Sequence, residues 1–145
     1  MPQEQSKRRV LVVEDEPKIR ATMLEHLRLA GFEVTAAVDG DEALSAVRTQ
    51  PFDLVILDLS LPKRSGLEVC QSLRKQPQSA RVPIILYTGK EQEDVIASLG
   101  TDQRQLQEWQ ADAYVHKTDG MAALLQQIHR VLWQGGAKPQ EPRHG

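Results

Sequence analysis

Acidic, hydroxyl and basic side chains stand directly after several apolar segments of this 145-residue chain. They are Glu14, Asp15, Glu16, Asp58, Thr88, His116 and Lys117. Asp58 ends the apolar run Leu-Val-Ile-Leu, within the stretch LVILDLSLP. Because an unpaired charge inside a buried segment is costly, we expect Asp58 to lie at an exposed edge of the fold, with its charge balanced by a cation.

These residue types have a shared chemistry. Carboxylates held close together repel, which raises the pKa of at least one of them unless a cation lies among them. Mg²⁺ prefers oxygen ligands and needs only one or two carboxylates besides water and phosphate. A carboxylate beside the ion can attack a phosphoryl group and become an acyl phosphate. Lys117 would add positive charge and Thr88 a hydrogen bond to the phosphoryl oxygens, so the sequence predicts phosphoryl acceptance at Asp58.

Alternating strands and helices must position these side chains. The expected strands are Val10–Val13, Glu33–Val38, Asp53–Leu57, Pro83–Tyr87 and Ala113–His116. The expected helices are Pro17–Ala30, Asp41–Arg48, Gly66–Lys75, a long segment Glu91–Gln110 and a last helix that begins near Asp119. This (βα)5 pattern predicts a doubly wound α/β fold, with a parallel sheet covered on both faces. In such sheets functional groups gather at the carboxyl ends of the strands.

Composition favours one ordinary globular domain. Hydrophobic residues make up 40% and charged residues 26% of the chain, and the net charge of -2 gives no basic footprint for nucleic acid. No apolar run is long enough for a signal-peptide core or a membrane span, and Cys70, the one cysteine, favours a reducing compartment. We expect a cytoplasmic protein with a flexible segment 1–8, a folded domain 9–134 and a disordered tail or linker 135–145.

Four motifs, VLVVEDE, LVILDLSLP, PIILYTG and DAYVHK, give the chain a specific family resemblance. From about Val10 to Leu132 it resembles the receiver (CheY-like) domain of two-component response regulators. The resemblance implies a flavodoxin-like three-layer sandwich, with a five-stranded parallel sheet in order 2-1-3-4-5. Two helices would cover one face of the sheet and three the other.

The same resemblance assigns roles to the candidate site. It implies that Asp58 is the phosphoacceptor and becomes 4-aspartylphosphate. Glu14, Asp15, Asp58 and the backbone carbonyl of Ser60 would hold Mg²⁺. Glu16 is not assigned to the metal site, and we expect its charge to stabilise the N-terminus of the first helix.

Signalling roles follow for three further residues: Thr88 resembles the switch hydroxyl, Tyr114 the switch aromatic, and Lys117 the lysine that contacts the phosphoryl group. The expected function is a phosphorylation-controlled switch of a phosphorelay. A sensor histidine kinase or phosphotransfer protein would supply the phosphoryl group, and a face formed by helix four and strand five would change its affinity for a partner. Its own catalysis would be limited to slow self-phosphorylation and autodephosphorylation. We also expect that the protein can form a homodimer through this face and helix five.

The chain departs from the family pattern at several positions. Glu14 replaces the commoner aspartate, and we expect metal binding to survive. Thr118 replaces the proline that usually follows the lysine, which leaves open whether the Lys117–Thr118 bond is cis or trans. Gly89 replaces a frequent alanine and predicts easier access for small phosphodonors or water.

The segment between Thr88 and Lys117 is longer than is typical of the family, by about seven residues. It carries Leu106 and Trp109, which we assign to a possible partner face. The family's Gly-Ala-Asp before strand five is here Gln110-Ala111-Asp112, without the glycine.

Two other functions are considered. A degenerate receiver that binds partners without phosphorylation is kept open by Thr118, although the intact acids and Lys117 argue against it. A haloacid-dehalogenase-type phosphohydrolase also uses a strand-end aspartate and Mg²⁺. That family needs a second acid two residues after the nucleophile, where this chain has Ser60.

Overall fold

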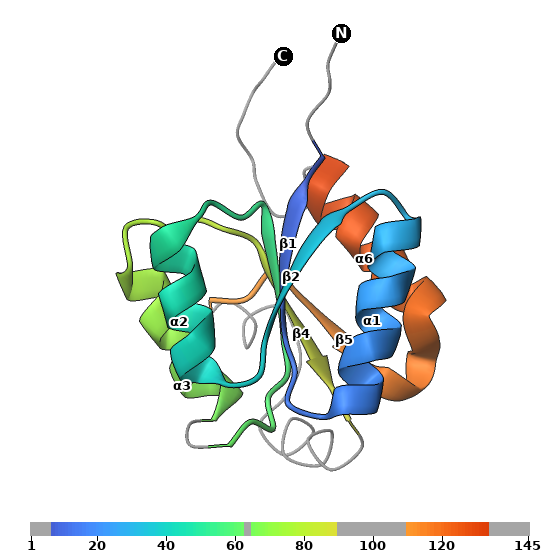
Figure 1. Cartoon of the computed structure of the whole chain (residues 1–145), viewed down its shortest axis with the longest axis horizontal. Helices are drawn as coiled ribbons and strands as arrows, with labels where there is room; N and C mark the ends of the chain where they lie inside the picture. Colours follow the sequence, from blue (N-terminus) through green and yellow to red (C-terminus); the bar gives the residue numbers. More distant parts are fainter. Residues whose placement is uncertain (1–6, 63–64, 90–109, 134–145) are drawn as a thin grey trace, which may run out of the picture.

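The computed structural model describes residues 7–62, 65–89 and 110–133 (Figure 1). The strands are β1 (Arg9–Val13), β2 (Glu33–Ala37), β3 (Leu54–Leu57), β4 (Ile84–Thr88) and β5 (Ala113–His116). The helices are α1 (Pro17–Leu29), α2 (Gly40–Thr49), α3 (Gly66–Lys75) and α6 (Gly120–Trp133), preceded by the short 3₁₀ helix η1 (Lys117–Asp119). These bounds lie within about one residue of those expected from the sequence. The long segment between β4 and β5, with Leu106 and Trp109, lies outside the described residues.

The five strands form one parallel sheet in the order β2-β1-β3-β4-β5, which confirms the expected topology. Strand β1 therefore lies between β2 and β3, and the chain reverses its direction of winding there. Helices α1 and α6 cover one face of the sheet, and α2 and α3 cover the other (Figure 1). Within the described ranges, two helices lie on each face.

Alternate residues of the strands point into two separate cores. Leu11 and Val13 of β1 pack toward α2 and α3, whereas Val10 and Val12 pack toward α1 and α6. All four are at most 1% exposed, as expected for a strand buried on both faces. Cys70 is a fully buried thiol in the first of these cores, and burial raises its pKa to about 11.

Helix starts are fixed by side chains that cap them. The carboxylate of Glu16 accepts a hydrogen bond from the Ile19 N–H at 3.0 Å and caps α1, so its expected helix-supporting role is confirmed. Ser65 and Glu68 form a capping box at the start of α3. These caps hold the first turns of α1 and α3 beside the carboxyl ends of β1 and β3.

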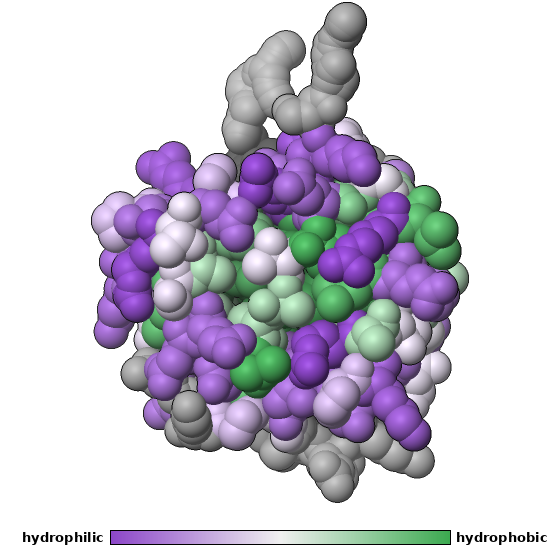
Figure 2. Space-filling view, in the orientation of Figure 1, coloured by the Kyte–Doolittle hydropathy of each residue, from purple (hydrophilic) through white to green (hydrophobic). Residues whose placement is uncertain are grey.

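The surface over α1 and α2 is mostly hydrophilic, and less polar residues are exposed along the edge strand β2 between them (Figure 2). Val34 is half-buried there and Ala36 is exposed. In the three described stretches, no helix has both the length and the apolar character that a bilayer crossing requires.

Candidate functional site

Three carboxylates meet at the carboxyl ends of β1 and β3. Glu14 and Asp15 follow β1 and Asp58 follows β3, and each offers an oxygen within 4.8 Å of the others. Asp15 is exposed, but Glu14 is 1% and Asp58 only 3% exposed. The expectation that Asp58 lies at an exposed edge was therefore wrong in degree, because its side chain is nearly fully buried and is in contact with Ser60 and Lys117.

Lys117 supplies the balancing charge. Its Nζ lies 2.9 Å from Glu14 Oε1 and 3.2 Å from Asp58 Oδ2. Among the described residues no peptide bond is cis, so the Lys117–Thr118 bond is trans. The lysine thus reaches both buried acids with threonine in place of the family's proline.

Burial dominates the electrostatics of this cluster. It raises the pKa of Asp58, against the opposing effects of the Ser60 N–H and Lys117. Burial also raises the pKa of Glu14, which the Lys117 hydrogen bond opposes and the charge of Asp58 reinforces. For Lys117, burial alone lowers the pKa, but the contacts with Glu14 and Asp58 outweigh it and the pKa is raised.

Backbone contacts hold the acidic loops in place. The Ser60 N–H donates to Asp58 Oδ1 at 3.1 Å, and the Glu16 N–H donates to Glu14 Oε2 at 3.2 Å. The Arg20 guanidinium donates to the carbonyl oxygens of Glu14 and Asp15 at 3.0 and 3.2 Å. Arg20 was not among the residues singled out from the sequence, although it lies one turn into the helix that follows the acids.

Gly66 is a second residue that the sequence reasoning missed. Its N–H donates to the Leu59 carbonyl at 2.9 Å, which brings the first residue of α3 against the loop after β3. A Cβ at this position would lie 2.5 Å from both the Asp58 carbonyl oxygen and Leu59 Cα. Only glycine fits this approach without a shift of the backbone that carries Asp58.

Thr88 ends β4 at the same edge of the sheet and is fully buried. Within the described ranges its hydroxyl oxygen has no hydrogen-bond partner. Leaving a buried hydroxyl unpaired costs about 1–3 kcal/mol. The next residue, Gly89, leaves space, because an added Cβ would meet only Lys117 Cδ, at 3.8 Å.

Tyr114 is half-buried on β5, on the face covered by α2 and α3. Lys117 and the three acids therefore lie together and Thr88 ends the strand next to β3, whereas Tyr114 packs against the core under α2 and α3. No described contact links Ser60's carbonyl to the cluster, and its role as a ligand stays a prediction.

The residues present fit a magnesium ion. Glu14, Asp15 and Asp58 offer hard carboxylate oxygens close to one another, which is the donor type that Mg²⁺ prefers. The lysine beside them has no lone pair when charged and cannot bind a metal. This donor set is unlike that of zinc or copper sites, which use histidine or cysteine.

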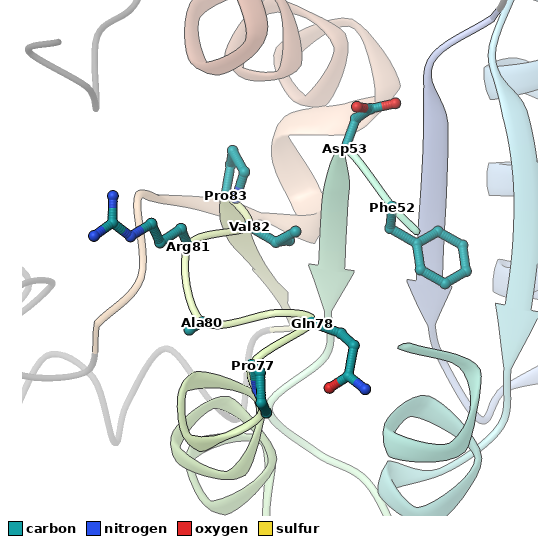
Figure 3. Close-up of a pocket in the computed structure, with 8 residues that line it drawn as sticks. All are labelled: Phe52, Asp53, Pro77, Gln78, Ala80, Arg81, Val82 and Pro83. Carbon is teal, nitrogen blue, oxygen red and sulfur yellow. The ribbon is translucent and has the colours of Figure 1, made fainter. Parts of the chain in front are cut away.

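One hollow adjoins this cluster and another lies far from it. One, of about 350 Å³, adjoins Lys117 between α1 and α6 and is lined largely by apolar side chains, among them Ile19, Tyr87 and Met121. Another, of about 370 Å³, lies at the amino ends of β3 and β4, lined by Phe52, Asp53, Arg81 and their neighbours (Figure 3). The second lies at the edge opposite Asp58 and takes no part in the acidic site.

The sequence matches the family described as response regulator receiver domain over residues 10–129. The chain therefore belongs to the receiver-domain family, and receiver domains are signalling modules of two-component systems. The DNA-binding dual master transcriptional regulator RpaA of Synechocystis sp. is 34% identical over 139 residues, covering 94% of this chain and 54% of RpaA. The chain thus spans about half the length of such curated relatives.

Solved structures agree with this assignment. The chemotaxis response regulator CheY4 of Vibrio cholerae has a TM-score of 0.75 at 29% identity, covering 88% of this chain and 100% of CheY4. The response regulator TrrA of Thermotoga maritima, solved in complex with Mg²⁺-BeF, has a TM-score of 0.71 at 36% identity, covering 86% and 99%.

Proposed function

We propose that this chain is a phosphorylation-controlled switch that accepts a phosphoryl group on Asp58 from a histidine kinase or phosphotransfer protein. The observation that carries the proposal is the convergence of Asp58 with two further acids and Lys117 at the carboxyl ends of the sheet. Receiver-family membership gives the class of function, and the acceptor and its partners are our assignment.

In this proposal Glu14, Asp15, Asp58 and the Ser60 carbonyl hold Mg²⁺, which supplies positive charge to the phosphoryl oxygens when bound. A carboxylate oxygen of Asp58 attacks phosphorus. The bond from phosphorus to the donor's imidazole nitrogen breaks, and the electron pair stays on that nitrogen. Lys117, which lies 3.2 Å from Asp58, then contacts the phosphoryl oxygens instead of the free carboxylate.

The unpaired hydroxyl of Thr88 supports a switch. A phosphoryl oxygen on Asp58 would give this buried group the hydrogen bond that it lacks in the described structure. Movement of Thr88 toward the site would be coupled to Tyr114 on the neighbouring strand β5. We propose that the face between helix four and strand five, including Leu106 and Trp109, then changes its affinity for a protein partner or a second copy.

Supporting assignments complete the proposal. The folded receiver spans residues 9–134 between a flexible start and a tail or linker, and the protein works in the cytoplasm. The apolar hollow beside Lys117 gives the donor protein a surface close to Asp58. Although RpaA is named as DNA-binding, we assign no nucleic-acid contact to this domain, because the chain as a whole is not basic and has a net charge of -2.

Phosphorylation of the purified protein with acetyl phosphate and Mg²⁺ tests the proposal, with intact-mass detection of the added phosphoryl group. Wild type should be labelled and Asp58→Asn should not. Asp53→Asn, at the other end of the same strand segment, is the matched control and should be labelled like wild type. Labelling of Asp58→Asn at the wild-type level would refute the acceptor assignment.

A degenerate receiver is the remaining alternative, favoured by Thr118 alone. It predicts no labelling of wild type and the same partner binding by wild type and Asp58→Asn, measured by pull-down from lysate. Membership of the receiver family leaves the phosphohydrolase alternative without support, and absent turnover of a phosphate ester such as p-nitrophenyl phosphate would agree with that.

A further inference from the structure

The short turn that carries Lys117 is built differently from the pattern implied by the family resemblance. Thr118 follows the lysine where a proline is usual, and the bond between them is trans. A proline restricts its own backbone, whereas a threonine leaves the turn to be fixed by hydrogen bonds. Such bonds are present on both sides of the lysine.

His116 provides the first of them. It is the last residue of β5, is 7% exposed and caps η1. Its Nδ1 accepts a hydrogen bond from the Thr118 N–H at 3.2 Å and lies 2.5 Å from the Thr118 hydroxyl oxygen. One imidazole nitrogen thus holds both the backbone and the side chain of the residue after the lysine.

The contact with the backbone requires His116 Nδ1 to act as an acceptor. A backbone N–H can only donate, so Nδ1 must offer its lone pair. The Thr118 hydroxyl lies beside the same nitrogen and shares this lone pair with the backbone N–H. Asparagine can place a carbonyl oxygen near the position of Nδ1 and accept in the same way, whereas leucine cannot accept at all.

Gly120 closes the other end of the turn. Its N–H donates to the Lys117 carbonyl, and its φ of 88° is a left-handed conformation that favours glycine. The backbone of Lys117 is therefore held between a histidine cap before the turn and a glycine after it.

The side chain of Lys117 depends on this base. From the turn it passes the Tyr87 ring, whose centroid lies 5.9 Å from Nζ, and reaches Glu14 and Asp58. Lysine has four rotatable bonds and loses much rotamer freedom when ordered. When the backbone of Lys117 is already fixed, fewer side-chain conformations compete with the one that places Nζ between the two acids, and less entropy is lost on ordering it.

We propose that His116 and Thr118 are a positioning pair for Lys117, replacing with side-chain hydrogen bonds the restraint that proline gives elsewhere. The inference rests on the proposed function for its consequence, since the lysine so positioned is the one that contacts the phosphoryl group. The positioning of Lys117 itself is already present in the unphosphorylated, metal-free protein, so it can be measured without Mg²⁺ and without phosphorylation.

NMR of the Lys117 ammonium group tests the positioning without any phosphoryl transfer. In Mg²⁺-free protein, the Nζ–H signal of wild type should be visible and shifted, because ion pairs slow its exchange with water. His116→Leu and Thr118→Val should lose the signal or move it to that of a solvated lysine. His116→Asn and Thr118→Ser, which keep an acceptor and a hydroxyl, should restore it, and His129→Asn on the exposed side of α6 is the external control.

Phosphorylation by acetyl phosphate then measures the consequence. We expect His116→Leu to slow labelling of Asp58 about tenfold, as for the loss of one charge-assisted hydrogen bond in the transition state. Its Mg²⁺ affinity should not fall, because Lys117 is not a ligand. Loss of both rate and Mg²⁺ affinity would show general damage to the site and overturn the positioning role.

The outcomes separate the two proposals. A wild-type Lys117 signal in both His116→Leu and Thr118→Val overturns the positioning pair, whatever the labelling rate. A signal lost in these two variants, together with a wild type that is never labelled, upholds the positioning and refutes the proposed acceptor function. If His116→Leu does not fold, the comparison of Thr118→Val with Thr118→Ser decides the question, since these two differ from wild type only at an exposed part of the turn.

Discussion

Gly66→Ala is predicted to destabilise the protein through the loop that carries Asp58. The added Cβ would lie 2.5 Å from the Asp58 carbonyl oxygen and from Leu59 Cα, where ordinary contact begins at 3.4 Å. Both neighbours are backbone atoms, so they cannot rotate away. The loop or the start of α3 must move by roughly 1 Å to relieve the overlap.

Overpacking of this kind costs about 1–3 kcal/mol. Alanine is favoured over glycine in helix interiors by at most about 1 kcal/mol, and the first position of α3 gains only part of that. The cost of the overlap therefore exceeds the gain in helix propensity, and the variant should be less stable than wild type. With about 4 °C for each kcal/mol in a domain of this size, the midpoint of thermal unfolding should fall by several degrees.

Gly89→Ala is the matched control beside the same site. Its Cβ would meet only Lys117 Cδ at 3.8 Å, and Gly89 is not among the glycines with a left-handed φ. Reduced freedom of the unfolded chain should leave stability unchanged or raise it by up to about 1 kcal/mol. Urea unfolding of both variants in Mg²⁺-free buffer measures the difference. Equal stability of Gly66→Ala and wild type would refute the close approach of α3 to Asp58.

Three further predictions follow from the site and its surroundings. Burial raises the pKa of Asp58, so the stability that its protonation contributes is present below its unfolded pKa of about 4 and is lost as pH rises through the folded pKa. Asp58→Asn should flatten this pH dependence and be more stable than wild type at pH 7, as measured by urea unfolding between pH 4 and 8. A lower stability of Asp58→Asn at pH 7 would contradict the prediction. Gln110 has a φ of 61°, so Gln110→Gly should stabilise the protein by about 1 kcal/mol in the same assay, whereas a loss would mean that its side chain is needed. Gly89→Ala should slow both labelling of Asp58 by acetyl phosphate and loss of the label, and unchanged rates would show that the open approach at this position has no role.

Much of the site could be predicted because it depends on strand ends. Apolar runs located β1, β3 and β4 closely, and parallel strands bring their carboxyl ends to one edge of the sheet. That rule was enough to bring Glu14, Asp58 and Lys117 together and to put Thr88 at the same edge of the sheet. The family resemblance added the strand order, which periodicity alone does not give.

The contacts between loops could not be predicted in this way. Gly66 matters because of 2.5 Å distances to a loop seven residues earlier, and glycine is too common at helix starts to signal such a contact by itself. Arg20 binds two carbonyl groups, which carry no sequence signal. The depth of Asp58 was misjudged because the position of an acid at a strand end gives no measure of how deeply the folded chain buries it.

The contact of Lys117 with the acidic cluster has a consequence for charge. Three ionised carboxylates and one ammonium carry a net charge of about -2, equal and opposite to that of one Mg²⁺ ion. With a bound Mg²⁺ ion, the ionised cluster would therefore form a neutral unit. In the proposed function, a phosphoryl group on Asp58 would convert this unit into an anion enclosed by low-dielectric protein, where its field is poorly screened. In the proposed function, phosphorylation therefore changes the charge at one place from neutral to negative, and we expect the Thr88 hydroxyl, which has no hydrogen-bond partner within the described residues, to turn toward it.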